Sequence, residues 1–288
     1  MRQIILSDYV TDVLEQRHRE RESRYAVKLE NYNNELKRRQ DRTDESRKLL
    51  TEAWKGWKLL QLIKCLFAYL DCRTLPRPRK PFPEGPDEID RRYASGREGE
   101  RRVDEYLRTR LSDEWILLCG YRNGKGETDR VLVGPGGIFS MEIKNINGYV
   151  SCKGDSWTRD ICDAYGRRVK LNVSIVDGNG NGRQRSPSSQ LNEPTDILER
   201  HLKRTLPDCR ICRIVILTHE RSRIAKLDDL KLDEVTLLSE WNLEATFEKS
   251  PCRLTKTEVE RIVQKIESHH HYMDRMMSSP DEGDKETA

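Results

Sequence analysis

The chemistry available to this sequence centres on two acidic residues and one lysine, Asp129, Glu142 and Lys144. They lie in two β-type runs that flank the turn sequence Gly-Pro-Gly-Gly at residues 134–137. Alternating runs on either side of a turn rich in Gly and Pro predict a β-hairpin. A hairpin would bring acids that are distant in sequence to the same place in the fold.

The register of this hairpin decides whether the three side chains meet. If Val133 pairs with Ile138, Asp129 lies opposite Glu142, and Lys144 lies on the same face. Directly opposed residues hold their Cβ atoms roughly 5 Å apart, so two carboxylates and one ammonium converge at one end of the hairpin. A slip of one residue would move Asp129 to the other face.

Two opposed carboxylates need a compensating partner, because like charges destabilise a hairpin and shift each other's pKa. A divalent cation is one such partner, since Mg²⁺ takes one or two carboxylates together with waters and substrate phosphate oxygens. The alternative is that Lys144 neutralises one acid while solvent surrounds the other. The hairpin alone leaves both interpretations open.

A third acid, Glu100, lies on the apolar stripe of a helix predicted from Tyr93 to about Leu111. An acid on a core-facing stripe suggests a function, although the helix dipole also favours an acid near a helix start. The small residues Gly96 and Gly99 would let this helix approach a sheet closely.

The remaining predicted elements follow from apolar runs, turn sequences and capping residues. The stretch at 177–182 is glycine-rich and is expected to be a loop, because no strand–loop–helix context supports phosphate binding there. Mixed strands and helices predict an α/β fold. The expected strands are 114–121, 148–152, 156–158, 171–176, 211–218 and 235–238, and the expected helices are 186–206 and 255–271.

An ordered set of motifs resembles the nuclease-related domain (NERD). That domain is similar to members of the PD-(D/E)xK nuclease superfamily, and the resemblance covers about residues 93–240. It implies a restriction-endonuclease-like core, a mixed β-sheet flanked by helices. Thr128 stands where the superfamily name has Pro, and residues 164–185 look longer than the usual link. The set is Gly96-x-x-Gly99-Glu100, Asp129, Gly-Pro-Gly-Gly, Glu142-Ile143-Lys144, Gly148, Trp157 and Gln190.

The resemblance also implies a metal site. Asp129 and Glu142 would bind Mg²⁺ or Mn²⁺, with the Ile143 carbonyl available as a third ligand. Glu100 would act as a ligand or through a bound water. Such a metal lowers the pKa of its water and offsets charge that develops on phosphate oxygens.

The same resemblance gives Lys144 and Gln190 catalytic roles. Lys144 would orient or deprotonate the attacking water, and Gln190 would position Lys144 or the scissile phosphate. From the sequence we expect Lys144 to be half exposed. The hypothesis is a metal-dependent DNA endonuclease. Two alternatives are a nucleic-acid-binding module with little activity and an interaction protein that acts through its N-terminal helix.

The chain of 288 residues divides into five predicted parts, and its equal shares of hydrophobic and charged residues, 35% each, favour an extended portion beside a compact one. A charged helical extension is expected at residues 1–72 and a proline-rich linker at 73–92. The nuclease-like domain is expected at 93–250, a C-terminal helix at 251–272 and a disordered tail at 273–288.

The N-terminal helix carries two features whose partners the sequence leaves open. Tyr25, Leu29, Tyr32 and Leu36 have coiled-coil spacing over a short stretch, so the helix is either solvated or pairs with a second copy. The apolar stretch Trp54–Leu70 is too short and too charged to span a bilayer. We expect it to pack within the protein, with a partner or a membrane surface as alternatives.

The sequence has no run of 18 apolar residues and no signal-peptide pattern, so we expect a soluble, cytoplasmic protein without integral membrane association. The net charge of +4 is compatible with DNA binding without indicating it. In a cytoplasmic protein the eight cysteines are expected to be reduced. Cys209 and Cys212 have half of a zinc-site spacing, but a buried free thiol is the ordinary alternative.

Overall fold

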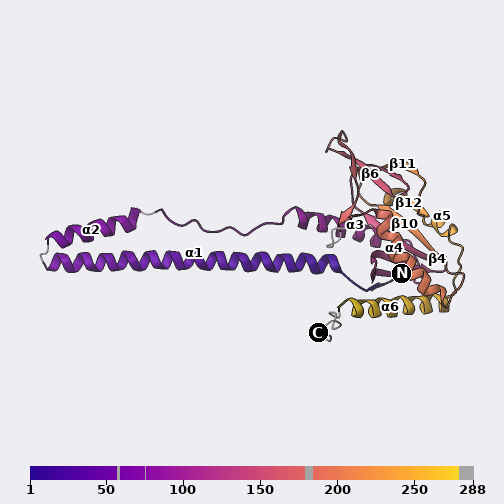
Figure 1. Cartoon of the computed structure of the whole chain (residues 1–288), viewed down its shortest axis with the longest axis horizontal. Helices are drawn as coiled ribbons and strands as arrows, with labels where there is room; N and C mark the ends of the chain where they lie inside the picture. The colour runs from indigo at the N-terminus through magenta and orange to yellow at the C-terminus, as the bar shows by residue number, and fades with distance from the viewer. Residues whose placement is uncertain (57–58, 75, 179–183, 279–288) are drawn as a thin grey trace, which may run out of the picture. The chain divides into compact units, whose positions relative to one another are not determined.

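The computed structural model describes residues 1–56, 59–74, 76–178 and 184–278, which form two compact units (Figure 1). One unit combines Met1–Thr11 with Arg91–Ala288, and the other is Asp12–Asp90. The helical unit is therefore inserted, in chain order, between the first residues of the larger unit and the rest of it.

The helical unit is held mainly by ion pairs. It contains most of α1 (Tyr9–Lys55), all of α2 (Leu59–Thr74) and the start of α3 (Glu88–Arg108). Arg17 lies 2.7 Å from Asp90, and Lys28 lies 2.6 Å from Glu84. Ala53 is the buried residue of α1, and none of the described residues of α2 is buried. Apolar packing therefore contributes little to this unit.

The expectation that the Trp54–Leu70 stretch packs within the protein is wrong for its described residues. Trp54 is 71% exposed, Leu60 80% and Phe67 68%. Trp57 and Lys58 lie outside the described residues. None of the described helices is long and apolar enough to cross a membrane.

The segment between α2 and α3 has no helix or strand from Pro76 to Asp87, as its prolines predict. Helix α3 begins earlier than predicted, because Asp87 and Asp90 cap it reciprocally. The Asp90 N–H donates to Asp87 Oδ1 at 2.9 Å, and the Asp87 N–H donates to Asp90 Oδ2 at 2.9 Å.

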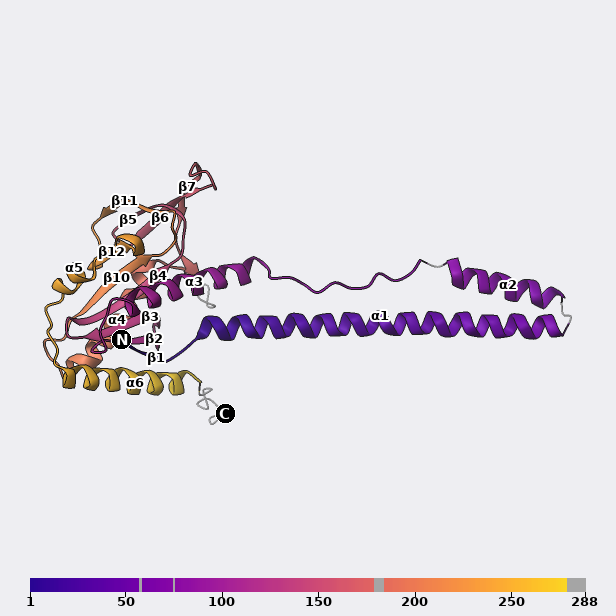
Figure 2. The ribbon, with the colours of Figure 1, turned by 180° about the vertical axis from the view of Figure 1, so that it is seen from behind.

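A mixed six-stranded sheet forms the centre of the larger unit (Figure 2). The β2–β3–β4 pairs are antiparallel, whereas β1 pairs with β2, and β10 with β4 and β12, in parallel. This confirms the predicted mixed sheet flanked by helices. In sheet order the strands are β1 (Arg2–Ile5), β2 (Ile116–Asn123), β3 (Gly126–Gly134), β4 (Gly137–Lys144), β10 (Ile211–Leu217) and β12 (Glu234–Leu237).

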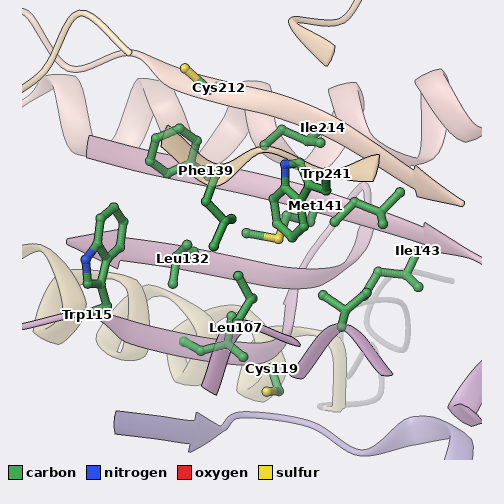
Figure 3. Close-up of a cluster of buried hydrophobic side chains, with 14 residues drawn as sticks. Leu107, Trp115, Cys119, Leu132, Phe139, Met141, Ile143, Cys212, Ile214 and Trp241 are labelled. Carbon is green, nitrogen blue, oxygen red and sulfur yellow. The ribbon is translucent and has the colours of Figure 1, made fainter. Parts of the chain in front are cut away.

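Helices cover both faces of this sheet because successive strand residues point to opposite sides. On one face, Val103 and Leu107 of α3 pack with Trp115, Leu132, Phe139 and Met141 (Figure 3). On the other face, α4 (Pro187–Lys203) and α6 (Lys256–Ser278) pack on alternate residues of the same strands. The residues of that second cluster include Ile116, Leu118, Val131, Val133, Leu198, Leu202, Ile262 and Ile266.

A smaller four-stranded sheet adds a third apolar cluster around Trp157 and Leu191. The predicted hairpin that turns at residues 153–155 is confirmed. The strands of this four-stranded sheet, in sheet order, are β11 (Ser222–Asp228), β5 (Gly148–Lys153), β6 (Ser156–Cys162) and β7 (Arg168–Ser174). The short remaining elements are β8 (Asp177–Gly178), β9 (Gln184–Arg185), the 3₁₀ turn η1 (Leu238–Glu240) and α5 (Leu243–Glu248).

Several boundaries differ from the sequence-based expectations. A helix beginning at residue 1 is wrong, because Arg2–Ile5 completes the sheet beside the buried strand β2. In the predicted 177–182 loop, Asp177–Gly178 is paired, and residues 179–182 lie outside the described residues. The predicted tail begins as helix, since α6 reaches Ser278, and residues 279–288 lie outside the described residues.

Candidate active site

The β3–β4 hairpin has the predicted register. Val133 pairs with Ile138, and the ladder continues to Arg130 opposite Met141. Asp129 follows directly at the end of that ladder, and its Oδ2 accepts a hydrogen bond from the Ile143 N–H at 2.6 Å. One candidate carboxylate is therefore fixed against the backbone of the strand that carries the others.

Glu142 and Lys144 form a buried ion pair. The Lys144 Nζ lies 2.8 Å from Glu142 Oε1, and the two side chains are only 13% and 4% exposed, respectively. The expectation of a half-exposed lysine is wrong, because β10 and α4 cover this end of the hairpin. A buried pair places both charges in surroundings where removing either partner has a large effect.

Gln190 reaches this pair from the start of α4. Lys144 Nζ donates to Gln190 Oε1 at 2.9 Å, and Gln190 Nε2 donates to the Arg185 carbonyl at 2.8 Å. Ser186 caps the helix by accepting from the Ser189 N–H at 3.0 Å. The capping serine fixes the first turn of α4, and so fixes the glutamine amide beside the lysine.

Glu100 approaches from the opposite face of the sheet, on α3. Arg130 Nη1 donates to Glu100 at 2.9 Å, while its Nε donates to Asp104 at 2.7 Å. Burial raises the pKa of Glu100 to about 7, and the negative charge of Asp129 acts in the same direction. Glu100 therefore lies close enough to Asp129 for the two carboxylates to repel.

Close packing of α3 on the sheet depends on one glycine rather than two. A Cβ at Gly99 would lie 2.7 Å from Thr218 Oγ1 and 2.9 Å from Asn145 Cβ. A Cβ at Gly96 would have no atom within 4 Å. Only Gly99 has the role predicted for both, and it sits next to Glu100.

These elements enclose a pocket of about 290 Å³. The pocket collects four of the predicted residues, while Lys144 and Ile143 act on it through their contacts with Glu142 and Asp129. It also contains groups that the sequence did not single out. Its lining includes Glu100, Asp129, Glu142 and Gln190, together with Glu127, Arg130, Arg185 and residues 7–10.

Arginines offset part of the acidic charge of the pocket. Burial raises the pKa of Glu127, and its hydrogen bond from Arg122 opposes that shift. Burial lowers the pKa of Arg130, but its hydrogen bonds with Asp104 and the negative charges of Asp104 and Glu100 together outweigh burial and raise that pKa, so Arg130 keeps its charge. The i, i+4 spacing of Glu100 and Asp104 on one helical stripe was the available signal for a buried cation between them.

The donor set suits a hard divalent cation by its chemistry, since the carboxylates of Glu100, Asp129 and Glu142 line one pocket. Among the described residues, no three His, Cys, Asp or Glu side chains are grouped closely enough to hold a metal ion by themselves. A magnesium site needs no such group, because Mg²⁺ keeps several waters and binds substrate phosphate.

The cysteine pair does not form a second site. Cys212 packs in the cluster under α3, whereas Cys209 packs in the cluster under α4 and α6, on the opposite face of the sheet. Burial raises the pKa of Cys209 to about 12 and that of Cys212 to about 11, so both stay as thiols. They are structural core residues.

The mixed sheet with helices on both faces, and with an acid- and lysine-bearing hairpin beside a pocket, is consistent with a restriction-endonuclease-like core. Residues 95–218 match the family model described as the nuclease-related domain (NERD). The match confirms the predicted resemblance and indicates a nuclease-related function for this part of the chain. No curated protein and no solved structure matches the chain.

Proposed function

We propose that the pocket at the end of the β3–β4 hairpin hydrolyses phosphodiester bonds of DNA with the help of Mg²⁺ or Mn²⁺. The observation that carries this proposal is the hydrogen-bonded series Glu142–Lys144–Gln190, which ends beside Asp129 and Glu100 in one pocket. The nuclease-related match over the same residues supports it.

Asp129 and Glu142 would hold the metal, with the Ile143 carbonyl and Glu100 as further oxygen donors. When bound, the metal would lower the pKa of a water and offset charge on the phosphate oxygens. Asp129 lines the pocket, and the Ile143 N–H orients its carboxylate. The site would need no covalent nucleophile.

Lys144 would orient the attacking water and stabilise charge on the phosphate. The neutral amine of a lysine can accept a proton at Nζ and its ammonium form can hold one, and burial strengthens the electrostatic effect of that charge. Gln190 would act as a positioning residue, because its Oε1 fixes the Lys144 ammonium at 2.9 Å. Arg130 would fix Glu100 in the same way from the α3 side.

Cleavage and metal binding test this proposal together. Purified protein is incubated with supercoiled, linear, branched and single-stranded DNA, and with RNA, in Mg²⁺, Mn²⁺ or chelator. We expect metal-dependent DNA cleavage that Asp129→Asn/Glu142→Gln lowers by about 10²–10³. Glu220→Gln removes an exposed acid that does not line the pocket and should cleave normally.

Divalent metal should also stabilise the protein, by about 2.7 kcal/mol at a concentration of 100 Kd. Calorimetric titration should show this affinity in wild type and in Glu220→Gln, and lose it in Asp129→Asn/Glu142→Gln. Equal metal affinity in all three proteins would refute the metal site at Asp129 and Glu142. Retained DNA binding without cleavage would instead indicate a binding module.

A further inference from the structure

A second cleft lies away from the catalytic pocket, between α4 and α6. Both helices pack on the same face of the six-stranded sheet, and the cleft has a volume of about 670 Å³. None of its residues lines the catalytic pocket. Its polar lining comes from Arg200, His201 and Arg204 of the α4 side and from Ser268, His269 and Tyr272 of α6.

The cleft is positively charged. Within the described ranges, no carboxylate lies at ion-pair distance from Arg200, Arg204 or the neighbouring Lys265, whereas Lys203 on the outer side of α4 pairs with Glu199 at 2.6 Å. Cations gathered without local acids favour an anionic ligand.

Two histidines in the cleft have lowered pKa values, in line with its positive charge. The rings of His201 and His269 lie 4.2 Å apart across the two helices. Burial, followed by repulsion from His201 and Arg204, lowers the pKa of His269 to about 4. Burial, followed by the charges of Lys265 and Arg204, also lowers the pKa of His201. Both rings are therefore neutral hydrogen-bonding groups beside exposed cations.

We propose that this cleft binds the phosphate backbone of a single-stranded nucleic-acid segment, with Tyr272 stacking on an unpaired base. Arg200 and Arg204 line the cleft and supply positive charge and N–H donors for phosphates. Tyr272 is 52% exposed at the rim, where its ring is open to a base. A cationic groove with an aromatic platform is the arrangement that binds single strands without sequence readout.

The cleft and the catalytic pocket are connected by shared elements, and this step rests on the proposed function. Gln190 and Arg200 lie on one helix, roughly 15 Å apart at 1.5 Å per residue, a distance that a few nucleotides of a single strand can span. The Arg122 N–H donates to His270 Nδ1 at 3.1 Å, and its side chain pairs with Glu127 of the catalytic pocket at 2.8 Å. A strand cut in the pocket could thus continue into the cleft.

The test measures binding without divalent metal, so that cleavage plays no part in it. Fluorescence anisotropy follows a labelled single-stranded oligonucleotide and the matching duplex at several salt concentrations. The test variant is Arg200→Gln/Arg204→Gln. The control, Lys256→Gln/Arg261→Gln, removes the same charge from exposed positions of α6 outside the cleft. Melting temperatures verify that all proteins are folded.

We expect the test variant to weaken single-strand binding on the order of tenfold. Its slope of log affinity against log salt should fall by about 1.4, since each phosphate contact contributes about 0.7 for single strands. The control should keep the wild-type slope. Tyr272→Ala should weaken single-strand binding roughly fivefold or more and affect duplex binding less.

Equal losses in the test and control variants, or no loss in either, would overturn the proposal. So would a mononucleotide that competes as well as the oligonucleotide, because the ligand would then be a small molecule. If wild-type protein does not cleave DNA, the proposed nuclease function is refuted, whereas single-strand binding by the cleft is still tested by the binding measurements. If the test variant cleaves and binds like wild type, the proposed role of the cleft is refuted and the proposed function is not affected.

Discussion

Replacing Lys144 by methionine separates a catalytic role from a structural one. The substitution keeps a long side chain in the β4 position and removes the ammonium that lies 2.8 Å from Glu142 and 2.9 Å from Gln190. Glu142, whose side chain is 4% exposed, then has lost its partner in the pair. The change therefore affects stability as well as chemistry.

The stability loss can be bounded. Removing one partner of a buried ion pair costs about 3–5 kcal/mol. Protonating an ordinary glutamate at pH 7 costs about 4 kcal/mol, so proton uptake by Glu142 limits the loss to that figure. At about 2–4 °C per kcal/mol, the melting temperature of a domain this size should fall by roughly 8–16 °C. The double variant Glu142→Gln/Lys144→Met also removes the carboxylate charge of residue 142 and should recover much of the lost stability.

The catalytic loss should be larger than stability explains. Single-turnover cleavage, measured well below each melting temperature, should fall by about 10²–10³ in Lys144→Met. Lys144→Arg keeps the charge but should not recover full activity, since a planar guanidinium cannot replace a compact ammonium beside a water. Near-normal cleavage by folded Lys144→Met would refute the catalytic role of this lysine.

Four further variants test the fold. Gly99→Ala should destabilise by about 1–3 kcal/mol through overpacking, whereas Gly96→Ala in the same helix should stabilise by about 0.5–1 kcal/mol, both measured by denaturant unfolding. Because the pKa of His269 is lowered to about 4, its contribution is fully present above pH 6.5 and is lost as pH falls towards 4. His269→Gln, which can still accept from the Tyr121 hydroxyl, should show a smaller loss of melting temperature between about pH 7 and pH 5. Deleting Met1–Ile5 should cost on the order of 3 kcal/mol, because it uncovers the edge of β2, and an unchanged melting temperature would contradict the role assigned to β1.

The hairpin could be predicted because local signals fix it. A Gly-Pro turn between two apolar runs sets Val133 opposite Ile138, and that register brings Asp129, Glu142 and Lys144 to one end of the hairpin. The capping serine of α4 was equally readable, since Ser186 precedes Pro187 at the helix start. Both signals lie within a few residues of the feature that they determine.

The missed features depend on contacts between distant segments. No role was predicted for Arg130, because only the packing of α3 brings Asp104 and Glu100 to it. The strand β1 has four residues, too few for a periodic pattern, and its pairing with β2 spans more than a hundred residues of sequence. Burial of Lys144 likewise follows from β10 and α4, which come later in the chain.

The inserted position of the helical unit has a consequence for any cut in the chain. A protease that nicks one bond between Asp12 and Asp90 would leave two fragments, each of which owns part of the same sheet. Arg2 N–H would still donate to the Trp115 carbonyl, and Leu6 N–H to the Cys119 carbonyl, both at 2.9 Å. The fragments should therefore stay associated as a nicked complex. The cut would be detected only after denaturation separates the two fragments.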